Sequence, residues 1–414
     1  MEEWKKYKIG DLCSISSSKR IFAKEYQSSG VPFFRGKEII EKQKGESIST
    51  ELYISRSRYD EIKIKYGVPK EGDMLLTSVG TLGIPYIVKN ENFYFKDGNL
   101  TWFSAFKGLN SKFLYYWFLS PIAKNAIEAK AIGSTQKALT IDTLSKFEIN
   151  LPDIDTQNRI ASILSFIDDK IELNRRINDN LEQQAQALFK SWFVDFEPFK
   201  EGKFVESELG MIPESWGVCS AETIFKINIG KTPPRKEQQW FSNINNGNVK
   251  WISISDLGSN EIFIEDSKEY LTKEAISKFN IIVVPEDTIL VSFKLTVGRV
   301  GISNCELTTN EAVARFYLPK SYFREYTYLS LKNYNYARLG STSSIATAVN
   351  SKIIKNMKLL IPPVTIISEF SKRINPLFNA IRIYENEIRN LSKIRNTLLP
   401  ELMSGKLKIN DMNN

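Results

Sequence analysis

The chain has 414 residues, of which 42 % are hydrophobic and 25 % charged, a composition typical of soluble globular proteins with two or three domains. It contains no histidine and only three well-separated cysteines, which excludes His-dependent catalytic triads and dyads, His-ligated zinc and CxxC motifs. The formal net charge of +8 favours a polyanionic partner, although many proteins carry as much charge without one.

The sequence shows no targeting or membrane signal. The first residues lack the apolar core of a signal peptide, and no run approaches the ~18 apolar residues that a membrane span requires. Widely spaced cysteines without a pairing pattern are typical of a reducing compartment. The sequence therefore predicts a cytoplasmic protein with no membrane partner.

Two similar halves follow one another, and in each a β-rich region precedes a helical one. The first β-rich region begins with Trp4 and ends at Pro152, and the second begins with Trp216 and ends at Pro362. Short segments rich in Ile, Val, Phe and Tyr, punctuated by Gly and Pro, predict strands and turns. The predicted segments are a β-rich domain over 1–152, a long helix over 153–195, a connector over 196–215, a second β-rich domain over 216–362, and a long helix with its tail over 363–414.

Short motifs recur inside the two β-rich regions. The turn over 68–73 resembles that over 284–287, because both begin with Val-Pro, end with Asp and lead into an apolar segment. A glycine-rich loop follows each turn, and we match residues 78–83 with residues 296–301. Each pair of motifs predicts a Pro/Asp turn, a buried strand and a polar loop.

After Pro152 and after Pro362, apolar residues recur at alternating steps of four and three, which is the spacing of a coiled-coil seam. The two seams share one register, because Leu164 and Ile374 lie 210 positions apart, as do Ile171 and Ile381. At 1.5 Å per residue each helix would reach ~55 Å, which favours packing of the two helices on each other over packing on their own domains alone. The predicted seams are Ile160, Leu164, Ile167, Ile171, Leu181 and Leu188 in the first helix and Ile374, Leu377, Ile381, Ile388, Leu391 and Leu398 in the second.

Polar residues and a proline interrupt these seams. Asn174, Asn178 and Arg395 are either buried groups that fix register or partner choice, or residues where the stripe is exposed. Pro376 either begins the second helix after a separate turn or kinks a longer helix.

The motifs of common enzymes are incomplete. Gly230-Lys231-Thr232 resembles the end of a phosphate-binding loop, but Phe225 stands where that loop needs glycine. There is no GxGxxG motif, and neither Pro-Pro site forms the tetrapeptide with which amino-methyltransferases clamp an extruded base. Asp153 and Glu201 formally match a nuclease metal motif, but the long helix lies between them. We therefore expect a chain that is not catalytic by itself and holds no metal.

The tandem arrangement resembles the specificity subunit of Type I restriction–modification systems. The resemblance covers nearly the whole chain, although Ile367 of the second half stands where the first half has Gln157. The segments that carry it most specifically are 151–171, 184–193, 208–216 and 398–407.

The resemblance implies an α+β fold with two tandem target-recognition domains. Their long helices would pack as an antiparallel coiled coil with pseudo-twofold symmetry. The chain would read a bipartite, asymmetric site in double-stranded DNA, one half-site per domain. It would recruit two methyltransferase subunits, which bring S-adenosylmethionine, and restriction motor-nuclease subunits, which bring ATP and Mg, while binding no cofactor itself.

Polar and basic loop residues are the candidate DNA contacts, because phosphates bind Lys, Arg and backbone N–H groups, and base edges bind polar side chains. The alternative for each residue is an ordinary solvated loop position or, for glycine, a turn former. The candidates are Arg35, Lys37, Thr77, Ser78, Gly80, Thr81, Gln136 and Lys137 in the first domain and Lys294, Thr296, Gly298, Arg299, Thr342 and Ser343 in the second.

Two other functions stay open at this point. The chain could be a scaffold whose coiled coil binds proteins while its charge is incidental, or a free-standing transcription regulator with the same domains. DNA binding with and without methyltransferase subunits distinguishes the three possibilities.

Overall fold

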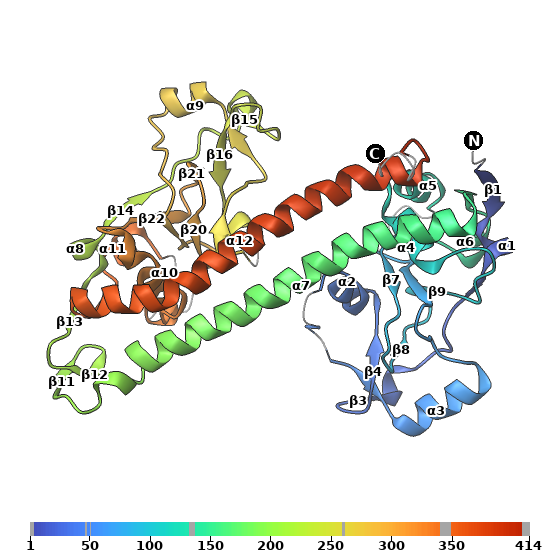
Figure 1. Cartoon of the computed structure of the whole chain (residues 1–414), viewed down its shortest axis with the longest axis horizontal. Helices are drawn as coiled ribbons and strands as arrows, with labels where there is room; N and C mark the ends of the chain where they lie inside the picture. The colour runs from blue at the N-terminus through green and yellow to red at the C-terminus, as the bar shows by residue number, and fades with distance from the viewer. Residues whose placement is uncertain are drawn as a thin grey trace. The chain divides into compact units, whose positions relative to one another are not determined.

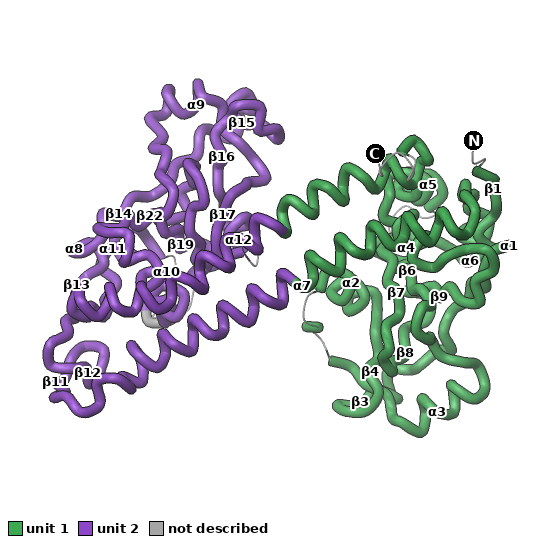
Figure 2. The backbone as a smooth tube through the Cα atoms, viewed as in Figure 1, with its two compact units in different colours: residues 1–173, 388–414 green, residues 174–387 purple. Residues whose placement is uncertain are grey.

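The computed structural model describes residues 4–45, 48–49, 51–131, 137–258, 261–339 and 349–407. The chain divides into two compact units, residues 1–173 with 388–414 and residues 174–387 (Figure 2). Each unit contains one β-rich domain together with part of each of two long helices (Figure 1).

Two four-stranded sheets form the β-rich domain of unit 1. Their strands pair antiparallel except for β4 with β8, and a further pair, β1 with β10, joins the entry and exit of the domain. The first sheet has the order β2 (Ser14–Ser16), β9 (Leu100–Ser104), β6 (Met74–Thr77), β7 (Pro85–Ile87); the second has β3 (Tyr26–Gln27), β5 (Tyr53–Ile54), β4 (Val31–Phe34), β8 (Tyr94–Phe95); β1 is Lys5–Lys8 and β10 is Glu148–Leu151. The helices are α1 (Ile9–Leu12), α2 (Gly36–Lys44), α3 (Arg56–Lys65), α4 (Ser111–Leu119), α5 (Pro121–Lys130) and α6 (Ile141–Ser145).

The β-rich domain of unit 2 repeats this plan with a five-stranded and a four-stranded sheet. Its entry and exit strands, β13 and β23, pair as β1 and β10 do. The sheets have the orders β14 (Lys226–Ile229), β22 (Val313–Tyr317), β19 (Ile289–Ser292), β20 (Val300–Ser303), β17 (Phe263–Ile264) and β15 (Phe241–Ser242), β18 (Tyr270–Leu271), β16 (Val249–Ile252), β21 (Thr308–Thr309); β13 is Gly217–Ser220 and β23 is Lys358–Ile361. The helices are α8 (Ala221–Ile224), α9 (Lys273–Lys278), α10 (Arg324–Lys332) and α11 (Ser351–Lys355), and the predicted connector contains the hairpin β11 (Phe204–Ser207) and β12 (Gly210–Pro213).

The predicted Pro/Asp turns lead into the buried strands β6 and β19, in which every residue is buried. The match of the glycine-rich loops was wrong by three positions. Gly83 N–H donates to the Thr77 carbonyl, and Gly298 N–H donates to the Ser292 carbonyl, so Gly83 corresponds to Gly298. The hydrogen bonds of the hairpin fix this register, whereas similar glycine spacing in the sequence does not.

The two long helices are α7 (Ile154–Phe193) and α12 (Val364–Met403), each of 40 residues. Pro376 lies inside α12, so the alternative of a separate first turn is wrong. In unit 1, Ile160 and Leu164 share a core with Leu402. In unit 2, the rings of Phe193 and Phe370 lie 4.7 Å apart. The early part of α7 thus meets the end of α12, and the late part of α7 meets its beginning, which confirms antiparallel packing of the two helices.

The predicted seams are buried or half-buried at every position. Ile160, Leu164, Ile167, Ile171, Ile374 and Ile381 are buried, and Leu181, Leu188, Leu377, Ile388, Leu391 and Leu398 are half-buried.

Asn174 also lies within the helix pair and is fully buried, so the alternative of an exposed stripe is wrong there. Its amide Nδ2 donates to Glu387 Oε2 at 2.8 Å.

We expect Leu164→Glu to lower the free energy of unfolding by several kcal/mol, because a carboxylate at this fully buried position has no partner. Chemical denaturation of the full chain measures the loss. Leu173→Glu on the same helix is the control, since Leu173 is 48 % exposed, and we expect a change within about 0.5 kcal/mol. Equal losses for the two variants would contradict the packing of α7 through its seam.

Candidate nucleic-acid interface

The loops that join β6 to β7 and β19 to β20 are closed by the same hydrogen bonds. Thr77 Oγ1 accepts from the backbone N–H of Ile84 at 2.9 Å, and Ser292 Oγ accepts from the backbone N–H of Arg299 at 3.0 Å. The hydroxyl of the last residue of each strand, Thr77 of β6 or Ser292 of β19, therefore holds the last residue of the loop that follows. The two units present the same loop scaffold, built from different sequences.

The first loop separates its residues into an inner and an outer group. Thr77 and Ser78 are buried, and Ser78 Oγ forms a hydrogen bond with Thr101 Oγ1 at 2.8 Å. Gly80 and Thr81 are exposed. The polar hydroxyls of the inner pair stabilise the domain, and the apex is the part that faces solvent.

Two further candidates of the first domain lie close to this loop. Ala138 forms a β-bridge with Val79, which brings the exposed Lys137 next to the apex. Gly36, at the start of α2, lies beside the methyl group of Thr77, so the exposed Lys37 is also nearby. Gln136 lies outside the described residues.

Arg35 pairs with Glu38 at the start of helix α2. Its Nη2 donates to Glu38 Oε1 at 2.6 Å, and its backbone N–H donates to Glu38 Oε2 at 2.8 Å. Burial raises the pKa of Glu38, but the hydrogen bonds from Arg35 outweigh it and hold that pKa below the ordinary value. The Arg35 side chain thus stabilises the start of α2, because some of its N–H groups donate to Glu38.

The second loop presents its apex to solvent and buries its base. Lys294 and Thr296 are exposed. Gly298 lies against the ring of Tyr336. Arg299 is half-buried, and its Nη1 donates to the carbonyl of Ile254 at 2.8 Å. The candidates Thr342 and Ser343 lie outside the described residues.

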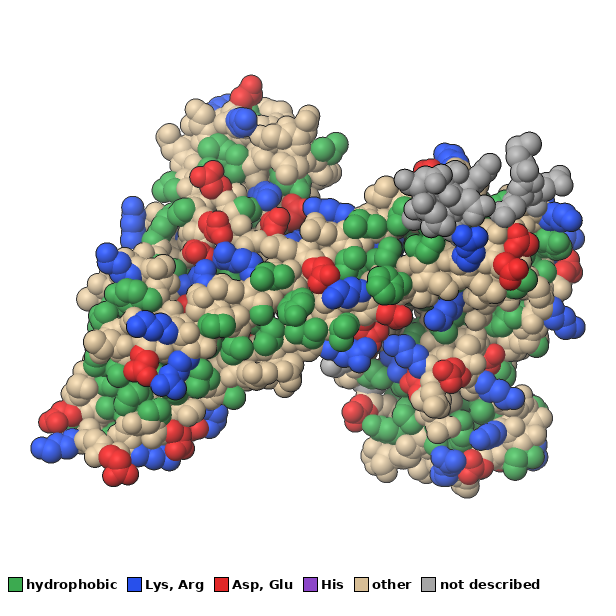
Figure 3. Space-filling model, in the orientation of Figure 1, with side chains coloured by type: hydrophobic (Ala, Val, Ile, Leu, Met, Phe, Trp, Pro, Cys, Tyr) green, Lys and Arg blue, Asp and Glu red, His purple; other side chains and the backbone are tan. Residues whose placement is uncertain are grey.

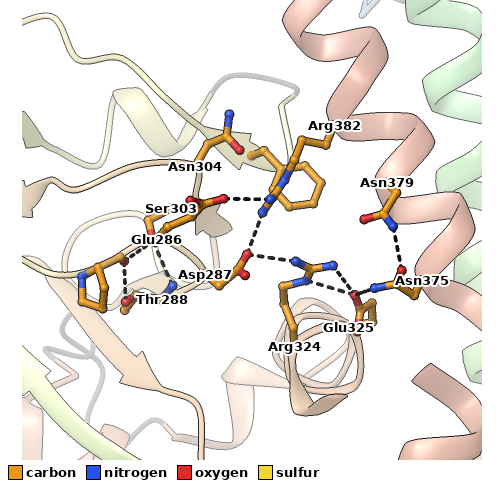
Figure 4. Close-up of polar contacts among 12 residues, drawn as sticks. Glu286, Asp287, Thr288, Ser303, Asn304, Arg324, Glu325, Asn375, Asn379 and Arg382 are labelled. Carbon is orange, nitrogen blue, oxygen red and sulfur yellow. Dashed lines mark hydrogen bonds and ion pairs between the residues drawn. The ribbon is translucent and has the colours of Figure 1, made fainter. Parts of the chain in front are cut away.

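An ion-pair network that the sequence did not indicate fixes the second β-rich domain on α12 (Figure 4). Asp287 accepts from Arg324 Nη1 at 3.0 Å and from Arg382 Nη2 at 2.6 Å. Glu325 is fully buried and accepts from Arg324 at 2.7 Å and from Asn375 at 3.2 Å. Because Arg382 and Asn375 belong to α12, the network joins the turn before β19, helix α10 and the long helix.

Single polar side chains of the long helices also bind the backbone of each domain. The Glu385 carboxylate of α12 is buried and accepts from the N–H groups of Ile262 at 2.6 Å and Phe263 at 3.0 Å. Gln157 of α7 is buried and accepts from the N–H of Asn110 at 3.0 Å. Each domain is therefore held to its helix by directional contacts as well as by apolar packing.

Asp168 connects three elements of unit 1. Its Oδ1 accepts from Arg395 Nη1 of α12 at 2.8 Å, and its Oδ2 accepts from the Tyr116 hydroxyl of α4 at 2.8 Å. Burial, together with the charge of Asp168, raises the pKa of Tyr116, which keeps this hydroxyl protonated as a donor. Arg395 on the predicted seam is thus half-buried and paired.

Charge is mixed on the face shown in Figure 3, where Lys and Arg side chains alternate with Asp and Glu over both units. Across the described ranges, no group of three or more Asp, Glu and Cys side chains is arranged to hold a metal ion. Within the same part of the chain, no helix combines the length and apolar character needed to cross a membrane.

The geometry defines a tandem-repeat protein: two related β-rich domains with solvent-facing loops, each fixed to a long helix. The chain matches the family described as "Type I restriction modification DNA specificity domain" over residues 1–183 and again over 213–393, and it belongs to this family. The resemblance predicted from the sequence is confirmed. The chain is a DNA-binding specificity subunit of the Type I restriction–modification class, in which this subunit is not the catalytic one.

Similar proteins match over almost the whole length of both chains. The specificity subunit of the Type I restriction enzyme MjaIX from Methanocaldococcus jannaschii is 29 % identical over 99 % of this chain and 95 % of its own. The HindI specificity subunit from Haemophilus influenzae is 25 % identical over 98 % and 100 %. The crystal structure of a Type I S subunit from M. genitalium has the same fold, with a TM-score of 0.61 at 17 % identity over 97 % and 96 %.

We expect Glu325→Gln to cost about 3–5 kcal/mol of unfolding free energy, because it leaves the buried Arg324 guanidinium without its nearest carboxylate. Glu286→Gln is the matched control, since Glu286 also pairs with an arginine of the network but is 53 % exposed. Its loss should stay below about 1 kcal/mol. Chemical unfolding followed by tryptophan fluorescence compares the two, and an inverted order would contradict the anchoring role of Glu325.

Proposed function

We propose that this chain reads a bipartite, asymmetric DNA target, with the domain over 1–152 reading one half-site and the domain over 216–362 reading the other. The observation that carries the proposal is the duplicated hairpin loop. Its hydrogen-bonded scaffold is the same in both units, but the exposed apices differ, with Gly80-Thr81 in the first and residues 294–296 in the second. Two copies of one scaffold with different side chains suit a target whose halves differ.

The long helices would set the separation of the two half-sites. We further propose that the chain acts in the cytoplasm together with two methyltransferase subunits and with restriction motor-nuclease subunits. The names of its relatives, which are specificity subunits of Type I restriction enzymes, support this assignment. S-adenosylmethionine, ATP and Mg would then be bound by those partners and not by this chain.

Two exposed apolar residues, one on each long helix, support the proposal of two equivalent sites for the methyltransferase subunits. Leu173 of α7 is 48 % exposed and Ile383 of α12 is 64 % exposed. They lie 210 positions apart, which is the offset of the two seams, so they occupy the same position in each repeat. An exposed apolar residue at the same position of each repeat suits two copies of one methyltransferase subunit.

We expect exchange of residues 1–152 for the matching domain of a relative to change one half of the methylated motif and leave the other unchanged. Insertion of four residues near Asn178, about one helical turn, should change only the spacer. Sequencing of methylated DNA from cells that carry each variant with its partner subunits is the measurement. A first-domain exchange that alters both halves would contradict the proposal. A chain that binds no DNA would be a scaffold, and one that binds its site tightly without methyltransferase subunits would be a regulator.

We expect Leu173→Glu and Ile383→Glu each to remove one of two methyltransferase subunits from the purified complex, because each adds a charge to an apolar contact. The mass of the complex in solution reports the number of subunits. Gln183→Glu, at an exposed position of α7, adds the same charge outside these sites and should keep both subunits. Retention of both subunits by the double variant would show that the partners bind elsewhere.

A further inference from the structure

The two hairpin loops place different residues at one special backbone position. With Thr77 equivalent to Ser292 and Gly83 equivalent to Gly298, the hydrogen bonds align Gly80 with Leu295. Both residues have left-handed backbone, with φ of +79° at Gly80 and +58° at Leu295. Glycine adopts this conformation without strain, whereas the Cβ of leucine opposes it.

Leu295 gains nothing from the fold to offset this strain. Its side chain is 98 % exposed, so it buries almost no apolar surface in the free chain. At the equivalent Gly80, the direction of a Cβ leads into open space. The backbone conformation is unfavourable for leucine, and so is the exposure of its apolar side chain to water. A contact outside the chain would explain why leucine stands at this position.

The loop around Leu295 suits DNA as that contact. Ser292 Oγ donates to the carbonyl of Thr296 at 2.6 Å and accepts from the N–H of Arg299 at 3.0 Å, which fixes the backbone on both sides of the apex. Lys294 is exposed next to Leu295, and no acidic residue occurs between residues 293 and 300. A fixed apolar tip beside a cation can approach a phosphate-lined groove and touch an apolar group inside it.

The C5-methyl group of thymine is the apolar group that DNA presents in its major groove. We propose that Leu295 reads a thymine of the second half-site by contact with this methyl group, while Lys294 binds a neighbouring phosphate. This inference rests on the proposed function, since it assigns a contact within the half-site read by the second domain. It also assigns different chemistry to the two loops, because Gly80 offers no side chain at the equivalent position.

The test uses the complete chain with its methyltransferase subunits and a duplex that carries the methylated motif. Each thymine of the second half-site is replaced in turn by deoxyuridine, which lacks only the C5-methyl group. One replacement should weaken binding by about 3- to 10-fold, the effect of losing one buried methyl contact. Leu295→Ala should weaken binding to the natural site by a similar factor and should bind the deoxyuridine and thymine duplexes equally.

Two variants separate this contact from loop strain. Leu295→Gly removes both strain and side chain, so it should keep or raise the thermal midpoint while it loses the preference for thymine. Gly80→Leu adds strain in the first loop, so it should leave the preference for thymine in the second half-site unchanged. If Leu295→Ala still discriminates thymine from deoxyuridine, or if the second half-site holds no thymine, the inference is overturned while the proposed function stands. If the complex shows no sequence-specific binding at all, the proposed function itself fails.

Discussion

The packing of α7 against α12 is the constraint on which the rest of the structure depends, because each helix contacts both the other helix and a β-rich domain. In unit 1, Asp168 accepts hydrogen bonds from Tyr116 of the β-rich domain and from Arg395 of the other helix. In unit 2, the ring of Phe193 lies 4.8 Å from Tyr326 of the domain and 4.7 Å from Phe370 of α12. A change on this face of α7 therefore disturbs the domain and the helix pair together.

The two repeats use different buried side chains to fix their β-rich domain to its long helix. The first repeat uses Gln157, which is buried and binds the backbone of Asn110. The second repeat has the buried Ile367 at the matching position, and its polar anchors lie instead at Glu325 and Glu385. A buried carboxylate needs several donors to offset its lost hydration, which explains why arginine, asparagine and backbone N–H groups converge on these two residues.

A recognition loop needs a fixed backbone and side chains that are exposed to solvent. The closing hydroxyls of Thr77 and Ser292 supply the first property in both units. The exposed apices supply the second property: both have a threonine, Thr81 and Thr296, but they differ beside it, since one has Gly80 where the other has Leu295. Such a division lets the exposed residues vary between repeats while the hydrogen bonds that shape the loop stay the same.

The sequence by itself determined the tandem repeat, the two long helices and their seams, because heptad spacing is local and directly reflects which helix face is buried. It also identified the buried strands behind each Pro/Asp turn. Only the tertiary structure decided that Thr77 and Ser78 are buried and that Gly83 corresponds to Gly298. These features depend on strand pairing and on contacts between residues far apart in the chain, which no local pattern specifies.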